Sequence, residues 1–207
     1  MPERLAKKRK AILDHETGVA RGIAFDMFPA GNLSVWEVLM PFLLIFSYVR
    51  RGQSRDWFEA NLLVTKHRAL EAAFDLANGH VTREEIGRRF EADTAKLLEA
   101  NTDDTYGEPV RRAQIAEMEA FTDHYLRLLD ASGETIVDLV RAAYVTESGF
   151  RRALGALAEA EAATIRASNE YLGERGDPEF AARLADAFSR IRTAQVERVF
   201  GPDAAAR

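Results

Sequence analysis

Hydrophobic positions recur at helical spacing along most of this chain. Phe58, Leu62 and Leu70, for example, lie four or eight residues apart and share one face of a helix. Helix starts are also marked: Thr82–Glu85 has the sequence of a capping box, and Asp177 precedes a proline as an N-cap does. No segment alternates apolar and polar residues between hairpin turns. We therefore predict an all-α fold, an antiparallel bundle of about seven to eight helices.

Caps, glycines and prolines set the predicted boundaries. Residues 3–15 form a basic amphipathic helix, and residues 17–33, which contain three glycines and a proline, are expected to be irregular. The other predicted helices cover 34–51, 55–77, 82–100, 109–130, 134–145, 149–172 and 178–200. We divide the chain into an N-terminal basic helix with an irregular apolar segment, 1–33, and a helical bundle, 34–207, with loop 101–108 as a candidate sub-boundary.

The stretch from Leu33 to Val49 is the most apolar part of the chain. All of its residues are apolar except Ser34, Glu37, Pro41 and Ser47. A helix of this length spans about 25 Å, which is less than the bilayer core of about 30 Å, and the proline predicts a kink near its middle. A helix that is apolar on all sides must be buried in protein or in lipid. In order of preference, it is a core helix wrapped by its neighbours, a monotopic or re-entrant anchor, or a full membrane span.

Aromatic residues are concentrated around this apolar stretch. Residues 25–58 contain 8 of the 19 aromatic side chains and both tryptophans. Tryptophan and tyrosine on the flanks, followed by arginines, are typical of a membrane interface, and also of a protein interface or core helix. If the segment docks on a membrane or partner, the docking residues are Phe28, Trp36, Phe42, Leu43, Ile45, Phe46, Tyr48, Arg50, Arg51 and Trp57.

Net charge and cysteine content limit which binding partners and which cellular compartment fit this chain. The net charge is −5, but residues 1–33 carry six basic and four acidic side chains, so the remaining chain is acidic and a poor match for nucleic acid. The basic cluster is interpreted as a solvated helix face in preference to a contact with phosphate or anionic lipid. The absence of cysteine excludes disulfides, zinc–thiolate sites and iron–sulfur clusters. With no secretory signal near the start, we expect a cytoplasmic protein, either free or peripheral or monotopic on the cytoplasmic side of a membrane.

Candidate chemistry is sparse. None of the four histidines has a glutamate three residues before it, so the helical di-iron pattern is absent. Two weaker pairs remain, His67 with Glu71 and Glu117 with His124, spaced to share a helix face as metal ligands or as an acid–base pair. For both pairs, a surface ion pair is the favoured interpretation. We assign no catalytic residue, metal or cofactor.

Two functions are compatible with these patterns. The first is a non-enzymatic helical protein that docks on a membrane surface or a protein partner through residues 23–58. The alternative is a soluble bundle that binds an apolar ligand or cofactor, as a carrier, sensor or helical enzyme. The apolar stretch would equally suit a subunit of a larger assembly or homo-oligomer, and the sequence leaves the question of enzymatic activity open.

Overall fold

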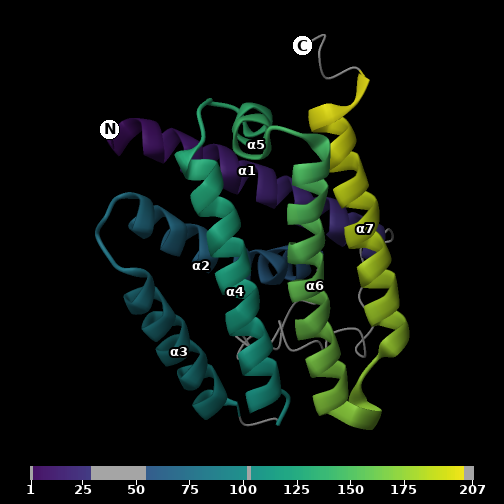
Figure 1. Cartoon of the computed structure of the whole chain (residues 1–207). Helices are drawn as coiled ribbons and strands as arrows, with labels where there is room; N and C mark the ends of the chain where they lie inside the picture. The colour runs from purple at the N-terminus through teal and green to yellow at the C-terminus, as the bar shows by residue number, and fades with distance from the viewer. Residues whose placement is uncertain (1, 29–54, 102–103, 203–207) are drawn as a thin grey trace.

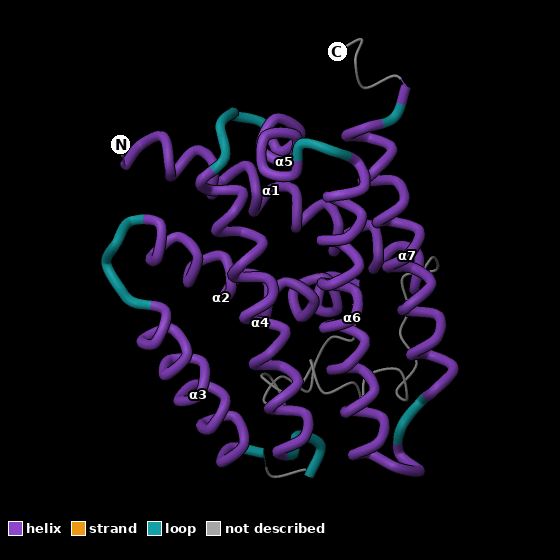
Figure 2. The backbone as a smooth tube through the Cα atoms, viewed as in Figure 1, coloured by secondary structure: helices purple, strands orange, loops and turns teal. Residues whose placement is uncertain are grey.

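The computed structural model describes residues 2–28, 55–101 and 104–202, almost all of them helical. The elements in chain order are α1 (Pro2–Met27), α2 (Arg55–Ala77), α3 (Arg83–Ala100), α4 (Glu108–Asp130), α5 (Ile136–Tyr144), α6 (Glu147–Leu172), a short 3₁₀ turn (Gly173–Arg175) and α7 (Pro178–Phe200). Within these ranges there is no strand, as Figure 2 shows. The predicted all-α fold is confirmed.

The helix starts follow the local chemistry read from the sequence. Thr82 and Glu85 form the predicted capping box, each bonding the backbone N–H of the other. Asp177 caps α7 by accepting a hydrogen bond from the N–H of Phe180, with a proline in the first turn. A capping box that the prediction did not include, Thr135 with Asp138, starts α5.

The first helix is longer than predicted. Residues 17–27 continue α1 instead of forming an irregular segment, so this prediction was wrong. Gly22 has a packing role, because a Cβ there would lie 3.1 Å from the Ile191 side chain of α7. Burial of Ile23 and Met27 against α2, α6 and α7 outweighs the low helix propensity of glycine.

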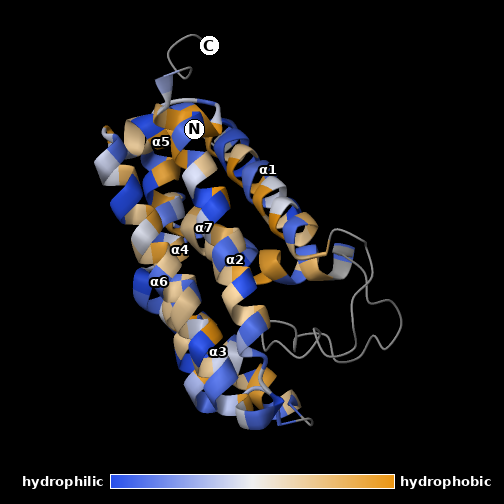
Figure 3. Cartoon of the chain, turned by 90° about the vertical axis from the view of Figure 1, so that its right-hand side faces the viewer, coloured by the Kyte–Doolittle hydropathy of each residue, from blue (hydrophilic) through white to orange (hydrophobic). Residues whose placement is uncertain are grey.

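The helices pack as an antiparallel bundle. In Figure 1, α4 runs upward, α6 downward and α7 upward again, while α1 and α2 lie behind them. Helix α4 is central and contacts α1, α2, α3, α5 and α6, whereas α1 also packs against α7. The N-terminal helix is therefore an integral part of the bundle. Figure 3 shows hydrophobic and hydrophilic residues mixed along each helix, as amphipathic packing requires.

Within the described helices, three apolar clusters form the core. The largest joins α1, α2, α4, α5, α6 and α7 near Ile12, Leu70 and Leu139. A second joins the end of α1 to α2, α6 and α7 around Phe58 and Phe180. A third packs α3 against α2 and α4.

The predicted helix 34–51, with the apolar stretch and its predicted proline kink, lies outside the described residues. Among the helices that are described, none is both long enough and apolar enough to cross a bilayer.

Candidate functional site

A layer of charged side chains crosses the interior between the first and second apolar clusters. On α1, α2, α6 and α7, a charged residue falls between a residue of one cluster and a residue of the other; Glu161, for example, lies between Leu157 and Ile165. We call this layer the buried polar network. Its members are His15 and Glu16 on α1, Lys66 on α2, Glu117, His124 and Tyr125 on α4, Glu161 on α6, and Arg192 and Gln195 on α7.

Lys66 is the cation at the centre of the network. Its Nζ lies 3.0 Å from Glu16 Oε2 and 3.8 Å from Glu161 Oε1, so it joins α2 to α1 and α6. Phe121 and Phe188 present their ring faces to the ammonium at 5.2 and 5.9 Å. Cation–π contact and two carboxylates together compensate a charge that is almost removed from water.

Arg192 is the second cation. Its Nη2 contacts Glu161 Oε2, and its guanidinium lies over the Phe188 ring at 5.2 Å. The Arg192 side chain is 19% exposed. Burial lowers its pKa to about 10, against the opposing influence of Glu16 and Glu117. Glu161 is thus shared between two cations.

Glu117 is the third buried carboxyl group, and it has no cation of its own. The residue is 3% exposed, and within the described ranges no ion pair or hydrogen bond reaches its Oε2. Burial raises the pKa of Glu117 to about 7, although a hydrogen bond from Thr164 and the charges of Lys66 and Arg192 lower it. Glu117 therefore exchanges a proton near neutral pH.

The two histidines of the network are neutral at that pH. Burial lowers the pKa of His124 to about 4, and its Nδ1 lies 2.6 Å from the Tyr144 hydroxyl. Burial also lowers the pKa of His15, whose Nε2 accepts a hydrogen bond of 3.0 Å from the Gln195 amide. Burial and the nearby Glu16 carboxylate raise the pKa of Tyr125. The charges of the network are thus carried by lysine, arginine and glutamate.

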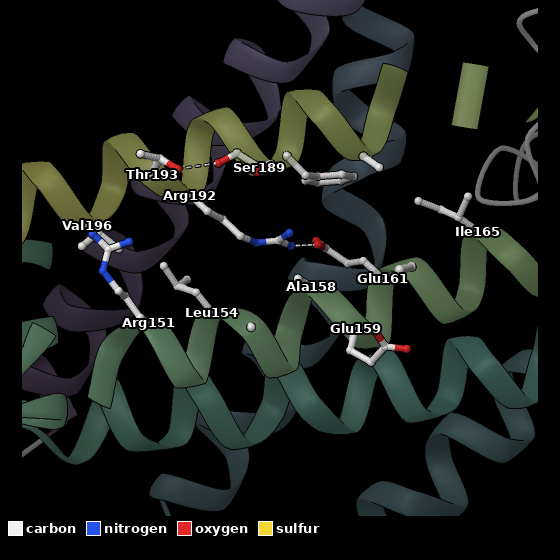
Figure 4. A pocket seen from close by; sticks show the side chains of 14 residues that line it. Arg151, Leu154, Ala158, Glu159, Glu161, Ile165, Ser189, Arg192, Thr193 and Val196 are labelled. Atoms are coloured by element: carbon white, nitrogen blue, oxygen red, sulfur yellow. Dashed lines mark hydrogen bonds and ion pairs between the residues drawn. The ribbon is translucent and has the colours of Figure 1, made fainter. Parts of the chain in front are cut away.

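The network connects to the surface through a groove between α6 and α7. This groove has a volume of about 410 Å³ and reaches a small interior cavity of about 40 Å³. Glu161, Arg192, Leu154 and Phe188 line both spaces, so the Glu161–Arg192 pair stands at the junction. Figure 4 shows Arg192 extending from α7 across the groove to Glu161 on α6.

A second groove, of about 630 Å³, opens between α4 and α6. His124 and Leu157 line both this groove and the interior cavity. Polar side chains therefore continue from one face of α6, through the interior, to the other face.

The two pairs predicted from their spacing lie in different surroundings. His67 and Glu71 lie 3.8 Å apart on the outside of α2, with His67 52% exposed, as the surface ion pair interpretation expects. Glu117 and His124 are not a surface pair, and that interpretation was wrong for them: Glu117 is buried, and the half-buried His124 lines the interior cavity, so both belong to the buried polar network. In the described part of the chain, no three His, Asp or Glu side chains converge as metal ligands.

Most of the predicted docking residues lie outside the described part of the chain. Eight of the ten, from Trp36 to Arg51, belong to residues 29–54. Trp57 lies in the first turn of α2, but its side chain is not described. Phe28 is buried, and its ring lies 5.0 Å from that of Phe58 and 6.2 Å from that of Phe180. In this arrangement Phe28 stabilises the second apolar cluster.

Sequence reasoning missed Lys66, Glu161 and Arg192. A signal was nevertheless present: Lys66 lies midway between Leu62 and Leu70, and Glu161 lies four residues before Ile165, each in register with the apolar face of its helix. A charged residue in that register must either disrupt the helix face or find a buried partner. Its recurrence on several helices pointed to an interior network.

Comparison of the chain with known protein families, with curated protein sequences and with solved structures found no match in any of the three.

Proposed function

We propose that the protein binds a small organic ligand in the groove between α6 and α7. The observation that carries this proposal is the placement of a largely buried ion pair, Glu161–Arg192, at the inner end of a groove of about 410 Å³. Ligand sites in proteins are typically concave, of about 300–1,000 Å³, and mainly apolar with a few polar groups that fix orientation. The α6–α7 groove has a volume in this range, and it combines apolar surface from Leu154, Ile165, Phe188 and Val196 with the polar side chains of Arg151, Glu159, Glu161, Ser189, Arg192 and Thr193.

Small residues of α6 and α7 open the groove. Gly155, Ala158 and Ala162 line it from α6, and Ala185 and Ser189 line it from α7. A Cβ added at Gly155 would meet nothing within 4 Å. The two helices therefore leave room for a ligand chain along their contact.

Apolar side chains and the ion pair give the groove two chemically distinct parts. Leu154, Ile165, Phe188 and Val196 supply apolar surface, whereas Arg192 offers a charged group near the junction with the interior. A ligand with an apolar body and one polar end matches this division. Its apolar body would pack on apolar side chains, and its polar end would bind a polar side chain. This supports an amphipathic ligand over a purely polar one.

A matched pair of glycine variants tests the proposal. Gly155→Leu places a side chain inside the groove, while Gly87→Leu adds the same side chain to α3, where a Cβ also meets nothing within 4 Å. We expect octanoate, octanol or octylamine to raise the melting temperature of the wild type and of Gly87→Leu. Gly155→Leu should weaken binding about tenfold or more, a loss of about 1.4 kcal/mol. Binding that is equal in the two variants, or no binding of any probe to the wild type, would contradict the proposal.

A second candidate is docking on a membrane surface through the aromatic-rich segment 23–58. The sequence supports it through the apolar stretch and its flanking tryptophans and arginines. In the described part of the segment, Phe25 is 51% exposed on α1, close to the start of that stretch. Basic side chains of α1, including Lys7 and Lys10, are exposed and would favour anionic lipid.

Vesicle flotation tests the second candidate. The full-length protein should float with vesicles of phosphatidylcholine and phosphatidylglycerol, and Phe42→Glu with Phe46→Glu should abolish flotation. A monomer that stays entirely in the soluble fraction would argue against docking on lipid. Vesicle-independent self-association that the same substitutions abolish would instead indicate a protein partner, namely a second copy of the chain.

A further inference from the structure

We propose that the ligand of the α6–α7 groove is an organic acid, whose carboxylate binds Arg192 and whose charge is balanced by a proton held on Glu117. This inference rests on the ligand-binding function proposed above and specifies its chemistry. Three features of the site support it: the N–H donors of Arg192, the number of buried charges, and the position of Glu117 among them.

Arg192 has more donors than acceptors. A guanidinium carries five N–H groups in a planar fork, and within the described ranges only Nη2 has a polar partner, Glu161. The remaining donors belong to a side chain that lines both the groove and the interior cavity. A carboxylate accepts two parallel N–H groups from such a fork, whereas an alcohol accepts fewer and an ammonium accepts none.

An incoming acid would find apolar surface beside this charge. Phe188 lies against the guanidinium, and Leu154 and Ile165 line the same groove. An acid with a short hydrocarbon chain can therefore place its carboxylate at Arg192 and its chain along α6 and α7. A ligand amine would instead approach the guanidinium with a like charge, and the two glutamates of the groove, Glu159 and Glu161, are already paired with Arg166 and Arg192.

The network already contains an excess of carboxyl groups. Glu16, Glu117 and Glu161 face two cations, Lys66 and Arg192, and both cations are engaged by Glu16 and Glu161. A ligand carboxylate raises the number of acids to four. With Glu117 ionised, the ligand would raise the excess of negative over positive charge in the network from one to two, which is strongly unfavourable inside a protein. Binding therefore favours the form in which one of these acids holds a proton, and molecules that lack this proton take it from solvent.

Glu117 is the group placed to take that proton. Lys66 of α2, Arg192 of α7 and Thr164 of α6 face it, and Tyr125 lies on its own helix. Glu16 and His15 of α1, His124 of α4 and Glu161 of α6 complete the titratable groups of the layer. With a pKa of about 7, Glu117 is half ionised at neutral pH, while both histidines are neutral because burial lowers their pKa values. A new negative charge near Arg192 raises the pKa of Glu117 further, so this carboxylate is protonated first.

Titration calorimetry with octanoate, octanol and octylamine tests both parts of the inference. We expect octanoate to bind the wild type at least tenfold more tightly than either of the other probes. Its affinity should fall by up to about tenfold per pH unit above about pH 7, where proton uptake is required. In buffers of different ionisation enthalpy, the heat at neutral pH should report uptake of about half a proton per ligand, because Glu117 is about half ionised before binding.

Two variants separate the roles of the two residues. Glu117→Gln cannot take up a proton, so it should bind octanoate with a flat pH profile and no dependence on the buffer. Arg192→Gln should weaken octanoate at least tenfold more than it weakens octanol, because a carboxylate accepts two N–H groups from the guanidinium fork and an alcohol accepts fewer. An equal loss for the two probes would contradict the role of Arg192. If octanol or octylamine bound as tightly as octanoate, and Gly155→Leu still weakened their binding, the inference of an acid ligand would be overturned. The proposed ligand-binding function would still stand. Octanoate binding with no proton uptake, or uptake that persists in Glu117→Gln, would overturn the role of Glu117. A wild type that binds none of the three probes would remove the proposed function and this inference together.

Discussion

Lys66 and His67 are neighbours on α2, yet they lie in opposite surroundings. Lys66 is 7% exposed and holds Glu16 at 3.0 Å in the interior, whereas His67 is 52% exposed and approaches Glu71 at 3.8 Å on the outer face. Both contacts pair a basic side chain with a glutamate. A helix turns successive residues by about 100°, so one step along the sequence moves a side chain from the core to water.

The comparison shows that surroundings, and not residue types or spacing, determine what a charged pair does. An exposed pair is screened by water and contributes about 0–1 kcal/mol. A buried pair gains little net stability as a unit, but loss of one partner leaves the other charge without compensation. The inner pair therefore constrains how the helices pack, whereas the outer pair constrains the packing little.

The largest expected effect is that of removing the central cation. Lys66→Met deprives Glu16 of its ion-pair partner and removes one of the two cations of Glu161, so we expect the free energy of unfolding to fall by about 3–5 kcal/mol. Chemical denaturation measures this loss. The control is Arg68→Met. Arg68 is on α2, like Lys66, but it forms a half-exposed ion pair with Asp93 of α3, so the free energy of unfolding should fall by less than about 1 kcal/mol. Equal losses in the two variants would show that the interior layer is hydrated in solution.

The next largest effect concerns Glu117 and depends on pH. Its pKa of about 7 in the folded protein lies above the ordinary value of 4.5, so the folded state binds the proton more tightly than the unfolded state. The contribution of Glu117 to stability is then greatest below about pH 4.5 and falls between about pH 4.5 and pH 7, because the unfolded state releases this proton at a lower pH than the folded state does. Glu117→Gln removes this penalty and should stabilise the protein by up to about 3 kcal/mol near pH 8, with little change near pH 4. Urea titrations at several pH values measure the difference, and a Glu117→Gln curve parallel to that of the wild type would contradict it.

Much of the fold could be predicted because the determining signals are local. The capping box at Thr82 and the cap at Asp177 depend on residues three positions apart, and the structure confirms both. The extent of α1 was missed because it depends on tertiary packing. Gly22 weakens a helix in isolation, but its lack of a side chain admits Ile191 of α7, which lies far away in the sequence.

The candidate site was harder to predict, since it exists only once the helices come together. Glu117 and His124 were recognised by their spacing on one helix, but spacing does not say whether their shared face points inward. Their partners lie on other helices: Lys66 on α2 and Arg192 on α7. A charged residue in an apolar register implies a buried partner, but which residues pair depends on how the helices pack.

A smaller effect tests the groove beside the network. In a helix interior, glycine is about 0.5–1 kcal/mol less favourable than alanine. Because a Cβ meets nothing within 4 Å at Gly155 or at Gly87, both alanine variants should gain about this amount in thermal or urea unfolding. Gly22→Ala should gain less or lose stability, since its Cβ would press on Ile191. A loss at Gly155 comparable to that at Gly22 would mean that the groove is filled in solution.

The smallest effect is expected at the outer pair, His67 and Glu71. A double-mutant cycle of His67→Ala and Glu71→Ala should give a coupling free energy below about 0.5 kcal/mol, because both side chains are substantially exposed. Glu71 also contacts Arg9 of α1 at 3.2 Å, so the Glu71 variant alone should be slightly less stable than the His67 variant. The corresponding cycle of Lys66→Met and Glu16→Gln should give a coupling several times larger, and added salt should diminish only the outer coupling. If both couplings were equally small and equally sensitive to salt, Lys66 would be in contact with water, and the protonation behaviour assigned to Glu117 would lose its physical cause.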